Sequence, residues 1–174
     1  AAEAAHVGAG DEVVGVVELN HDLVEFVFVT SDTQLLHFAA AGVRPQGRAG
    51  GGMAGVKLSP GAKVVFFGAM PTADSSVVTV AGSSAALPGT DSGTVKVTPL
   101  AEYPGKGRAT GGVRCHRFLK NEDTLLLAWA GPDPLIAAAA SGTPIDLPAP
   151  DPRRDMSGVP VAQPIAAVGS RYHS

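Results

Sequence analysis

The chain has 174 residues, of which 45% are apolar, and a formal net charge of −3 at pH 7. The apolar content excludes an intrinsically disordered protein, and the length allows one good core or a few small stacked ones. With 22 Gly, 14 Pro and only 17% charged residues, the composition favours an all-β protein with many turns over a helical one.

Short runs of alternating apolar and polar residues predict β-strands along most of the chain. Residues 1–10 lack an initiating methionine and are interpreted as a frayed end or as the cut edge of a longer chain. A hairpin is expected around Ser31-Asp32-Thr33, where the Ser and Asp side chains can bond the turn backbone. In this first part of the chain the expected strands are 12–19, 26–30, 34–38, 55–58 and 63–68.

The same order of elements returns further along the chain. The strands expected there are 77–81, 94–98, 113–119 and 124–129. A weaker third set covers 135–147, 153–161 and 165–168. Residues 136–140 also fit one helical turn, but Ser141-Gly142-Thr143 matches the earlier hairpin turns, so a strand is favoured. The many prolines from Pro148 to Pro164 suit an edge or terminal unit.

An internal repeat links these parts. Setting Gly107-Arg108-Ala109 on Gly47-Arg48-Ala49 also aligns Gly111-Gly112 with Gly51-Gly52. A period of roughly forty to sixty residues made of short strands is typical of a propeller-like array, in which one unit cannot bury its apolar face alone. We therefore predict about three units of four-stranded blades. Their expected bounds are 11–70, 71–131 and 132–169.

Motifs of catalysis and metal binding are missing from the sequence. It has no GxxxxGK[ST], HExxH, paired CxxC or GxSxG motif, and its five histidines lack metal-ligand spacing. Cys115 is the only cysteine, which excludes an internal disulfide and agrees with a reducing cytoplasm. The longest apolar run, 125–130, is too short to span a membrane. We expect no catalytic residue, metal site, cofactor or membrane association in this domain.

Basic residues beside glycine recur in each unit. Small neighbours allow a nucleic-acid backbone to approach guanidinium and ammonium groups, so the pattern suits contact with phosphates. Ordinary solvated charges flanking strands are the alternative interpretation. The candidate DNA-contacting residues are Arg44, Arg48, Lys106, Arg108, Arg114, Arg117, Arg153 and Arg154.

These segments resemble the C-terminal β-pinwheel of the A subunit of bacterial type IIA topoisomerases, DNA gyrase and topoisomerase IV. The family segment has the form V-Q-G-R-A-T-Q-G-V-R-x-I-x-L-x-x-G-D-x-V. Val43-Arg-Pro-Gln-Gly-Arg-Ala-Gly-Gly-Gly-Met53 and Glu102-Tyr-Pro-Gly-Lys-Gly-Arg-Ala-Thr-Gly-Gly-Val-Arg114 match it, and Ser59-Pro-Gly-Ala-Lys-Val-Val65 matches its tail. The resemblance covers residues 11–131 well and 135–168 weakly.

The resemblance implies an all-β pinwheel whose basic outer rim binds and bends duplex DNA. Its implied partners are double-stranded DNA, the ATPase B subunit of the holoenzyme, and the N-terminal cleavage core that belongs to the same polypeptide as the pinwheel. It implies a non-catalytic domain of an ATP-dependent topoisomerase, because neither Tyr103 nor Tyr172 lies in a setting like that of the catalytic tyrosine. The domain is expected in the cytoplasm.

Three features depart from the family pattern. The gyrase box Q-R-R-G-G-K-G is absent, which leaves the choice between gyrase and topoisomerase IV open. A complete pinwheel has about twice as many blades, so the chain is either a fragment or a shortened pinwheel. The net charge of −3 predicts weak DNA binding.

Two other classes of function remain open. A propeller-like protein–protein interaction module without DNA binding would use exposed apolar residues, and Phe66, Phe67 and Trp129 are the candidates, although strand positions favour a core role. A small propeller-like enzyme would need polar groups converging on a central pocket, and the expected inner strands offer mostly Val, Leu and Ala.

Overall fold

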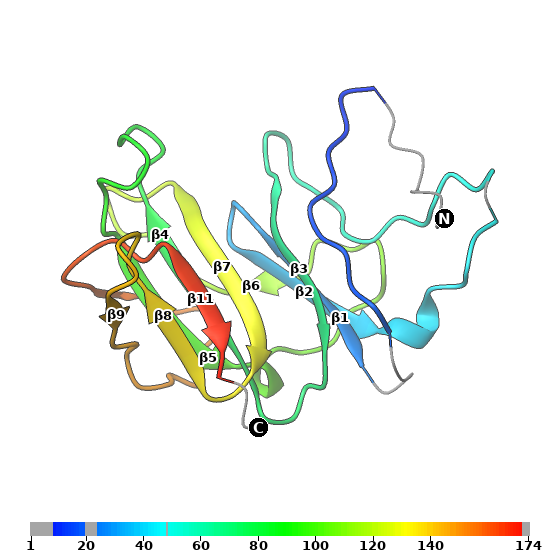
Figure 1. Ribbon diagram of the computed structural model, residues 1–174. Helices are drawn as coiled ribbons and strands as arrows, with labels where there is room; N and C mark the ends of the chain where they lie inside the picture. The colour runs from blue at the N-terminus through cyan, green and yellow to red at the C-terminus, as the bar shows by residue number, and fades with distance from the viewer. Residues whose placement is uncertain (1–8, 20–23, 48, 172–174) are drawn as a thin grey trace.

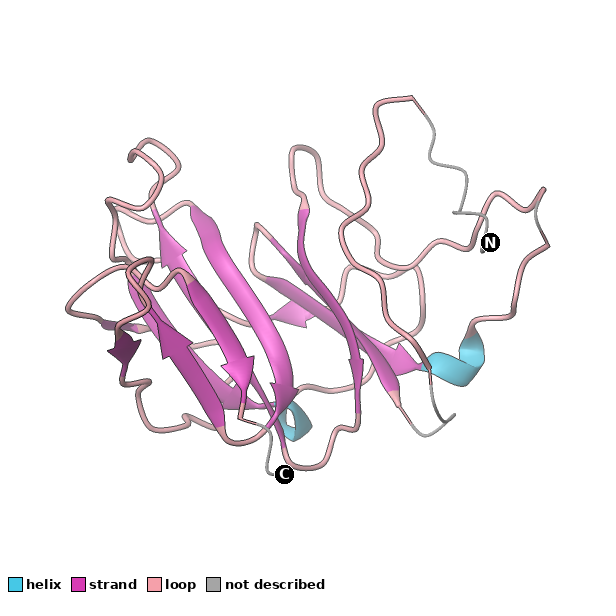
Figure 2. Ribbon diagram, viewed as in Figure 1, coloured by secondary structure: helices cyan, strands magenta, loops and turns pink. Residues whose placement is uncertain are grey.

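The computed structural model describes residues 9–19, 24–47 and 49–171. Within them, all regular structure consists of short β-strands and two 3-10 turns (Figure 2). The strands are β1 Glu25–Thr30, β2 Gln34–Ala39, β3 Val64–Met70, β4 Ser75–Gly82, β5 Thr94–Pro99, β6 Val113–Arg114, β7 Thr124–Pro132, β8 Leu135–Ala138, β9 Pro144–Ile145, β10 Val159–Pro160 and β11 Ala167–Ser170. The turns are η1 Ala40–Gly42 and η2 Leu100–Glu102.

The strands form three antiparallel sheets within the described part of the chain. Sheet A has the order β3-β1-β2-β6, sheet B the order β10-β5-β4-β7, and sheet C the order β11-β8-β9. Each sheet is built on one hairpin, and the chain returns later to place a further strand beside the first strand of that hairpin. The inner strands β3, β7 and β11 lie side by side across the molecule (Figure 1).

Strands are exchanged between successive units. β6 lies between β5 and β7 in the sequence, yet it pairs with β2 of sheet A, with Leu35 opposite Val113. β10 likewise comes after β9 but pairs with β5 of sheet B, with Val95 opposite Val159. The fourth strand of sheets A and B is therefore donated by the following unit, which ties each sheet to the next.

Apolar side chains fill the spaces between the sheets. Val27, Val29 and Leu35 of sheet A pack against Val77 and Leu125 of sheet B in one buried cluster. Val78, Val80 and Val97 form a second cluster on the other face of sheet B, together with Ala137 and Ile165. Because both faces of β4 are buried, this strand has no solvated side, and its run of β-branched residues suits that position.

The outer face of sheet A carries a third cluster, rich in phenylalanine. Phe26, Phe28, Phe38 and Phe67 pack with ring centroids 4.9 to 6.1 Å apart. Val17 and Val56 cover this cluster from the segments 11–19 and 43–58. These two segments are extended but form no ladder, so the expected strands 12–19 and 55–58 are wrong.

The expected all-β fold and its hairpins are confirmed. The hairpin strands β1, β2, β4 and β5 and the long strand β7 fall where alternation placed them, and residues 135–138 form a strand, as favoured over a helical turn. The expected strand 113–119 is wrong in extent, because only 113–114 pair with β2 before the chain turns away. The unit bounds 11–70, 71–131 and 132–169 stay a prediction.

No helix in the described ranges is long and apolar enough to cross a membrane.

Candidate nucleic-acid interface

The segment after η2, residues 104–112, runs along the outer edge of sheet A. The amide of Lys106 donates to the carbonyl of His37 at 3.2 Å, and the amide of Cys115 donates to that of Thr33 at 2.8 Å. The second unit thus lays its basic segment on the hairpin of the first. We call residues 43–58, 104–117 and 151–160 the outer segments of the three units.

Glycine is needed where an outer segment crosses a hairpin. Gly112 has a φ of 74°, and a Cβ there would lie 2.2 Å from the carbonyl oxygen of Leu35. A Cβ on Gly158 would lie 2.8 Å from the carbonyl oxygen of Val95, the corresponding position of sheet B. The close approach of two backbones therefore explains the glycine that precedes each exchanged strand.

Neighbouring outer segments are also tied to each other, in the same way in both pairs. Nη1 of Arg108 donates to the carbonyl of Ala54 at 2.7 Å, and Nη1 of Arg154 donates to that of Arg114 at 3.4 Å. The repeat that aligns Arg108 with Arg48 also aligns Arg114 with Ala54. The arginine of the second outer segment and that of the third therefore each reach back to the same position of the preceding segment.

Backbone hydrogen bonds repeat this register. The amide of Lys57 donates to the carbonyl of Thr110 at 2.9 Å, and the amide of Arg117 donates to that of Met156 at 3.0 Å. Successive outer segments thus lie next to one another along the rim of the sheets. Any basic side chains they expose belong to one continuous surface.

The eight expected DNA-contacting residues fall into different environments. Arg44, Lys106, Arg114 and Arg117 are exposed, and within the described ranges their charged ends have no hydrogen bond or ion pair. Arg108 and Arg154 each use part of the guanidinium for the ties described above. Arg48 lies outside the described residues.

The guanidinium of Arg153 forms an ion pair with a carboxylate of its own outer segment. Its Nε and Nη2 donate to the two oxygens of Asp151 at 3.0 and 2.9 Å. Mainly because of these hydrogen bonds, the pKa of the Asp151 carboxyl falls to about 2. Arg153 therefore carries less uncompensated charge than Arg114 or Arg117, although its side chain is exposed.

A hollow lies beside the two exposed arginines of the second outer segment. It is lined by residues of the first hairpin turn and the start of β2, and by residues of β6 and the segment after it, among them Asp32, Gln34, Arg114, Arg117 and Phe118. Arg114 and Arg117 flank it with positive charge, whereas Asp32 adds a negative one. An anion entering there would meet two guanidinium groups and one carboxylate.

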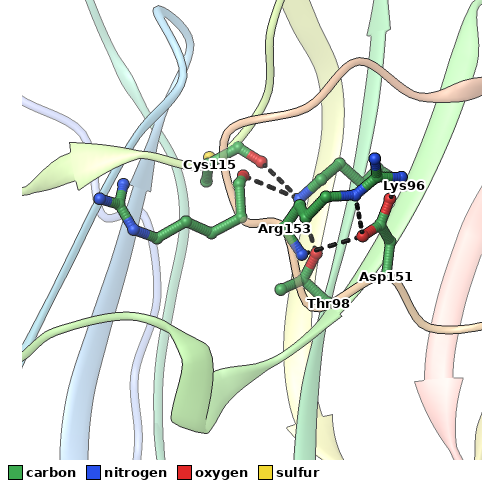
Figure 3. A network of polar contacts seen from close by, with 6 residues as sticks. Lys96, Thr98, Cys115, Asp151 and Arg153 are labelled. Atoms are coloured by element: carbon green, nitrogen blue, oxygen red, sulfur yellow. Dashed lines mark hydrogen bonds and ion pairs between the residues drawn. The ribbon is translucent and has the colours of Figure 1, made fainter.

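A buried lysine joins the outer segments to sheet B (Figure 3). Lys96 is 3% exposed, and its Nζ donates to Oγ1 of Thr98 at 2.6 Å and to the carbonyls of Cys115 at 3.2 Å and Arg154 at 2.8 Å. Burial lowers the pKa of Lys96 to about 8. Its three donors are satisfied without a direct carboxylate partner, so it holds carbonyls of two successive outer segments together.

The sequence analysis did not single out Lys96, although a signal was present. In Thr94-Val-Lys-Val-Thr98 the alternation places Lys96 on the same face as two threonines, between two buried valines. A polar face inside an otherwise apolar strand indicates a buried hydrogen-bonded site.

Two buried histidines form hydrogen bonds within the fold. His116 is 0% exposed; its Nε2 accepts from the amide of Gly158 at 3.2 Å, so Nδ1 carries the proton and donates to Oγ1 of Thr79 at 2.9 Å. Burial lowers the pKa of His116 to about 4, and the charge of Lys96 adds to the shift. His37 contacts the Glu25 carboxylate through Nδ1 and donates from Nε2 to the carbonyl of Tyr103 at 2.8 Å. Neither histidine belongs to a metal-binding cluster of described residues.

The aromatic residues considered for protein binding take part in packing. Phe67 lies in the phenylalanine cluster on the outer face of sheet A. The rings of Phe66 of β3 and Trp129 of β7 lie near each other, with centroids 6.4 Å apart. All three side chains are partly buried. The preference for a core role over a docking role agrees with this arrangement.

Comparison with known proteins finds a family and several proteins that are similar to this chain. A family model described as the DNA gyrase C-terminal domain, a beta-propeller, matches residues 25–69 and 89–126. Topoisomerase subunit TopoM of Mycolicibacterium smegmatis is 41% identical over 100 residues, which are 58% of this chain and 13% of that protein. The DNA gyrase A protein of Escherichia coli is 35% identical over 104 residues, which are 60% of this chain and 11% of that protein.

Solved structures show the same fold. The C-terminal domain of a DNA topoisomerase IV superposes with a TM-score of 0.65 at 21% identity, covering 85% of this chain and 46% of that one. The C-terminal domain of E. coli ParC superposes with a TM-score of 0.68 at 14% identity, covering 95% of this chain and 67% of that one.

Hairpins joined by exchanged strands, with inner strands side by side, define a β-pinwheel, a propeller-like repeat domain. The matched segments include the first hairpin, and in the second unit they include β5 and the Gly-Arg-Ala segment. By these matches the chain is related to the C-terminal domains of DNA gyrase A, and its fold is that of the C-terminal domains of type IIA topoisomerase A subunits. It aligns with only a small part of the curated relatives, 11 to 13% of the two named above.

Proposed function

We propose that this domain binds the backbone of duplex DNA along its outer segments. The observation that carries the proposal is the exposure of Arg44, Lys106, Arg114 and Arg117 on segments that lie next to one another. Duplex DNA presents phosphates at regular spacing, so cations along a continuous rim can contact several of them. Arg48 belongs to the proposed set by its place in the repeat.

The contacts of the described residues support the proposed DNA contacts unequally. Arg114 and Arg117 flank one hollow and have free guanidinium groups, so we expect them to contribute most. Arg108 and Arg154 keep donors for phosphate beyond those used on Ala54 and Arg114. Arg153 contributes least, because a phosphate would compete with Asp151 for it.

By relationship to the family, we propose that the bound DNA is bent and presented to the cleavage core of the same polypeptide. In the holoenzyme this core would work with the ATPase B subunit in the cytoplasm. The domain contributes DNA geometry to that reaction, and no residue of the domain is proposed as catalytic.

Binding of a short DNA duplex across a series of salt concentrations tests the proposal. Each phosphate contact contributes about 0.9 to the slope of log K against log salt, so four free cations give a slope of roughly −3.5. Replacing Arg114 and Arg117 together by Gln should weaken binding and reduce the magnitude of the slope by about 2.

A matched control separates rim contacts from net charge. Lys63, just before β3, and Lys120, in a turn, are exposed outside the outer segments, and their double Gln variant has the same net charge as the arginine variant. It should keep nearly all of the slope. Equal losses in both variants, or absence of duplex binding at low salt, would contradict the proposed interface.

A further inference from the structure

Asp32, at the turn of the first hairpin, lines the hollow beside Arg114 and Arg117. Oδ1 of Asp32 accepts a hydrogen bond from Oγ1 of Thr30 at 2.5 Å. Among the described residues its carboxylate has no other hydrogen bond and no ion pair. His116 also lines the hollow and is neutral at pH 7, since its pKa is about 4. Asp32 therefore brings an unpaired negative charge into a hollow that is otherwise positive.

The first hairpin turn does not depend on this charge. The only hydrogen bond to the Asp32 side chain comes from a hydroxyl, and an amide oxygen could accept it equally well. The carboxylate of Asp91, in the loop between β4 and β5, is used differently. It accepts from the backbone amides of Ser83 at 2.8 Å and Gly93 at 2.9 Å, so it holds its own loop. The negative charge of Asp32 has no comparable structural role among the described residues.

The hollow is also the more strongly basic of the two corners at which an exchanged strand meets a hairpin. Counted from the exchanged strands, Arg114 of β6 corresponds to Pro160 of β10, and Arg117 corresponds to Gln163. An anion at the corner of sheet A therefore meets two guanidinium groups that the corner of sheet B does not have. Asp32 opposes one of these two positive charges at the place where they would act most strongly.

We propose that Asp32 sets the affinity of this hollow for phosphate groups and keeps it low. A phosphate that reaches both guanidinium groups also comes close to the carboxylate, and like charges at the edge of a protein repel each other. The proposal deepens the proposed function and rests on it for the source of the phosphate, which is the backbone of duplex DNA. With Asp32 in place, DNA contact at this corner is weak and readily reversed.

Asp32→Asn tests the proposal because it removes the charge and keeps the acceptor for Thr30. Its affinity for a short DNA duplex at low salt should exceed that of the unchanged chain by about threefold to tenfold, the range for two unit charges several Å apart near a protein surface. Circular dichroism spectra verify that the variant keeps the fold. An affinity equal to or lower than that of the unchanged chain would overturn the proposal.

Asp74→Asn is the matched control, with the same change of net charge. Asp74 is exposed in the turn after β3, and Met70 of that strand pairs with Glu25 at the end of β1 opposite the first hairpin turn. Its φ of 55° is one that Asn tolerates. The control should change duplex affinity by less than about twofold, because the solvent and its salt screen distant charges. Equal gains in both variants would show an effect of net charge and refute the role of Asp32.

A double-mutant cycle locates the effect in the hollow. In the Arg114→Gln, Arg117→Gln background no guanidinium draws a phosphate toward Asp32, so adding Asp32→Asn should raise duplex affinity by less than about twofold. A gain as large as that in the unchanged background would mean that Asp32 acts outside the hollow, and this would contradict the proposal.

Titration with inorganic phosphate separates this proposal from the proposed function. NMR shifts of the backbone amides of residues 113–118 report binding in the hollow without DNA. Asp32→Asn should bind phosphate about threefold more tightly than the unchanged chain. If it does so while neither chain binds the duplex, the role of Asp32 holds and DNA binding by the rim is contradicted. Equal phosphate affinities, or no phosphate binding by either chain, would overturn the role of Asp32 even where the duplex binds.

Discussion

Acid should destabilise this domain through His116. The ring is 0% exposed, accepts a hydrogen bond from the amide of Gly158 and donates one to Thr79. Protonation would put a hydrogen on the nitrogen that faces the Gly158 N–H and would charge a ring already buried near Lys96. Burial, together with that neighbouring charge, lowers the pKa of His116 from 6.5 to about 4.

The sign and size of the effect follow from linkage. Between pH 6.5 and 4 the unfolded chain binds a proton that the folded one does not, so the free energy of unfolding falls as the pH falls. From pH 7 to pH 4 the loss is about 3 kcal/mol, a large share of the 5 to 15 kcal/mol typical of a domain.

Denaturant unfolding at pH values from 4 to 7 measures this contribution. Carboxylates also titrate in this range, so the unchanged chain is compared with His116→Gln, which retains them all. The difference between the two free energies of unfolding should change by about 3 kcal/mol across the range. A difference that does not vary with pH would show that His116 is not held neutral by the fold.

Two further changes test the packing of the outer segments. The pKa of Lys96 is about 8 in the folded chain and 10.5 in the unfolded one, so the unchanged chain should gain about 2 kcal/mol of unfolding free energy between pH 8 and 10. Lys96→Met should lack this gain. Urea unfolding at the two pH values measures it, and an equal change of unfolding free energy in both chains would contradict the prediction. Gly112→Ala should cost several kcal/mol or prevent folding, because the Cβ meets the Leu35 backbone. Gly107→Ala, whose Cβ would have its nearest neighbour at 4.0 Å, should cost little, and thermal melting compares the two.

The sequence predicted the hairpins well because their information is local. In Phe26–Thr30 and Gln34–Phe38 the turn residues and the alternation lie within one short stretch, and the observed pairing of Phe26 with Phe38 follows from that turn. The same holds for Val77–Ala81 and Thr94–Thr98, where a longer loop does not disturb the register.

The prediction of strands at 12–19 and 55–58 was wrong for a physical reason. Alternation shows that a segment can lie extended with one apolar side, and both segments do cover the phenylalanine cluster. A strand also needs a neighbouring strand with which it forms a continuous ladder, and residues 55–58 meet the neighbouring outer segment at only a few points, such as Lys57 with Thr110. The partner belongs to another unit, so no local pattern reveals it.

In the candidate site, too, local features could be predicted from the sequence and contacts between units could not. The sequence located the basic residues through their recurrence beside glycine, but it could not separate free charges from engaged ones. Arg153 finds Asp151 two residues away, and this pairing was visible in principle. Arg108 and Arg154 find backbone carbonyls of the preceding unit, and only the fold brings those carbonyls close.

The recurring Gly-Arg pattern therefore has a structural basis apart from any ligand. Gly112 lets the outer segment cross the hairpin, and Arg108 ties that segment to the one before it. Since these two requirements already explain a glycine and an arginine in the second and third units, the pattern alone is no evidence of DNA binding. The informative residues are Arg114 and Arg117, which no contact in the described chain requires, and a charge exposed on an ordered rim without a structural role is the one to test against DNA.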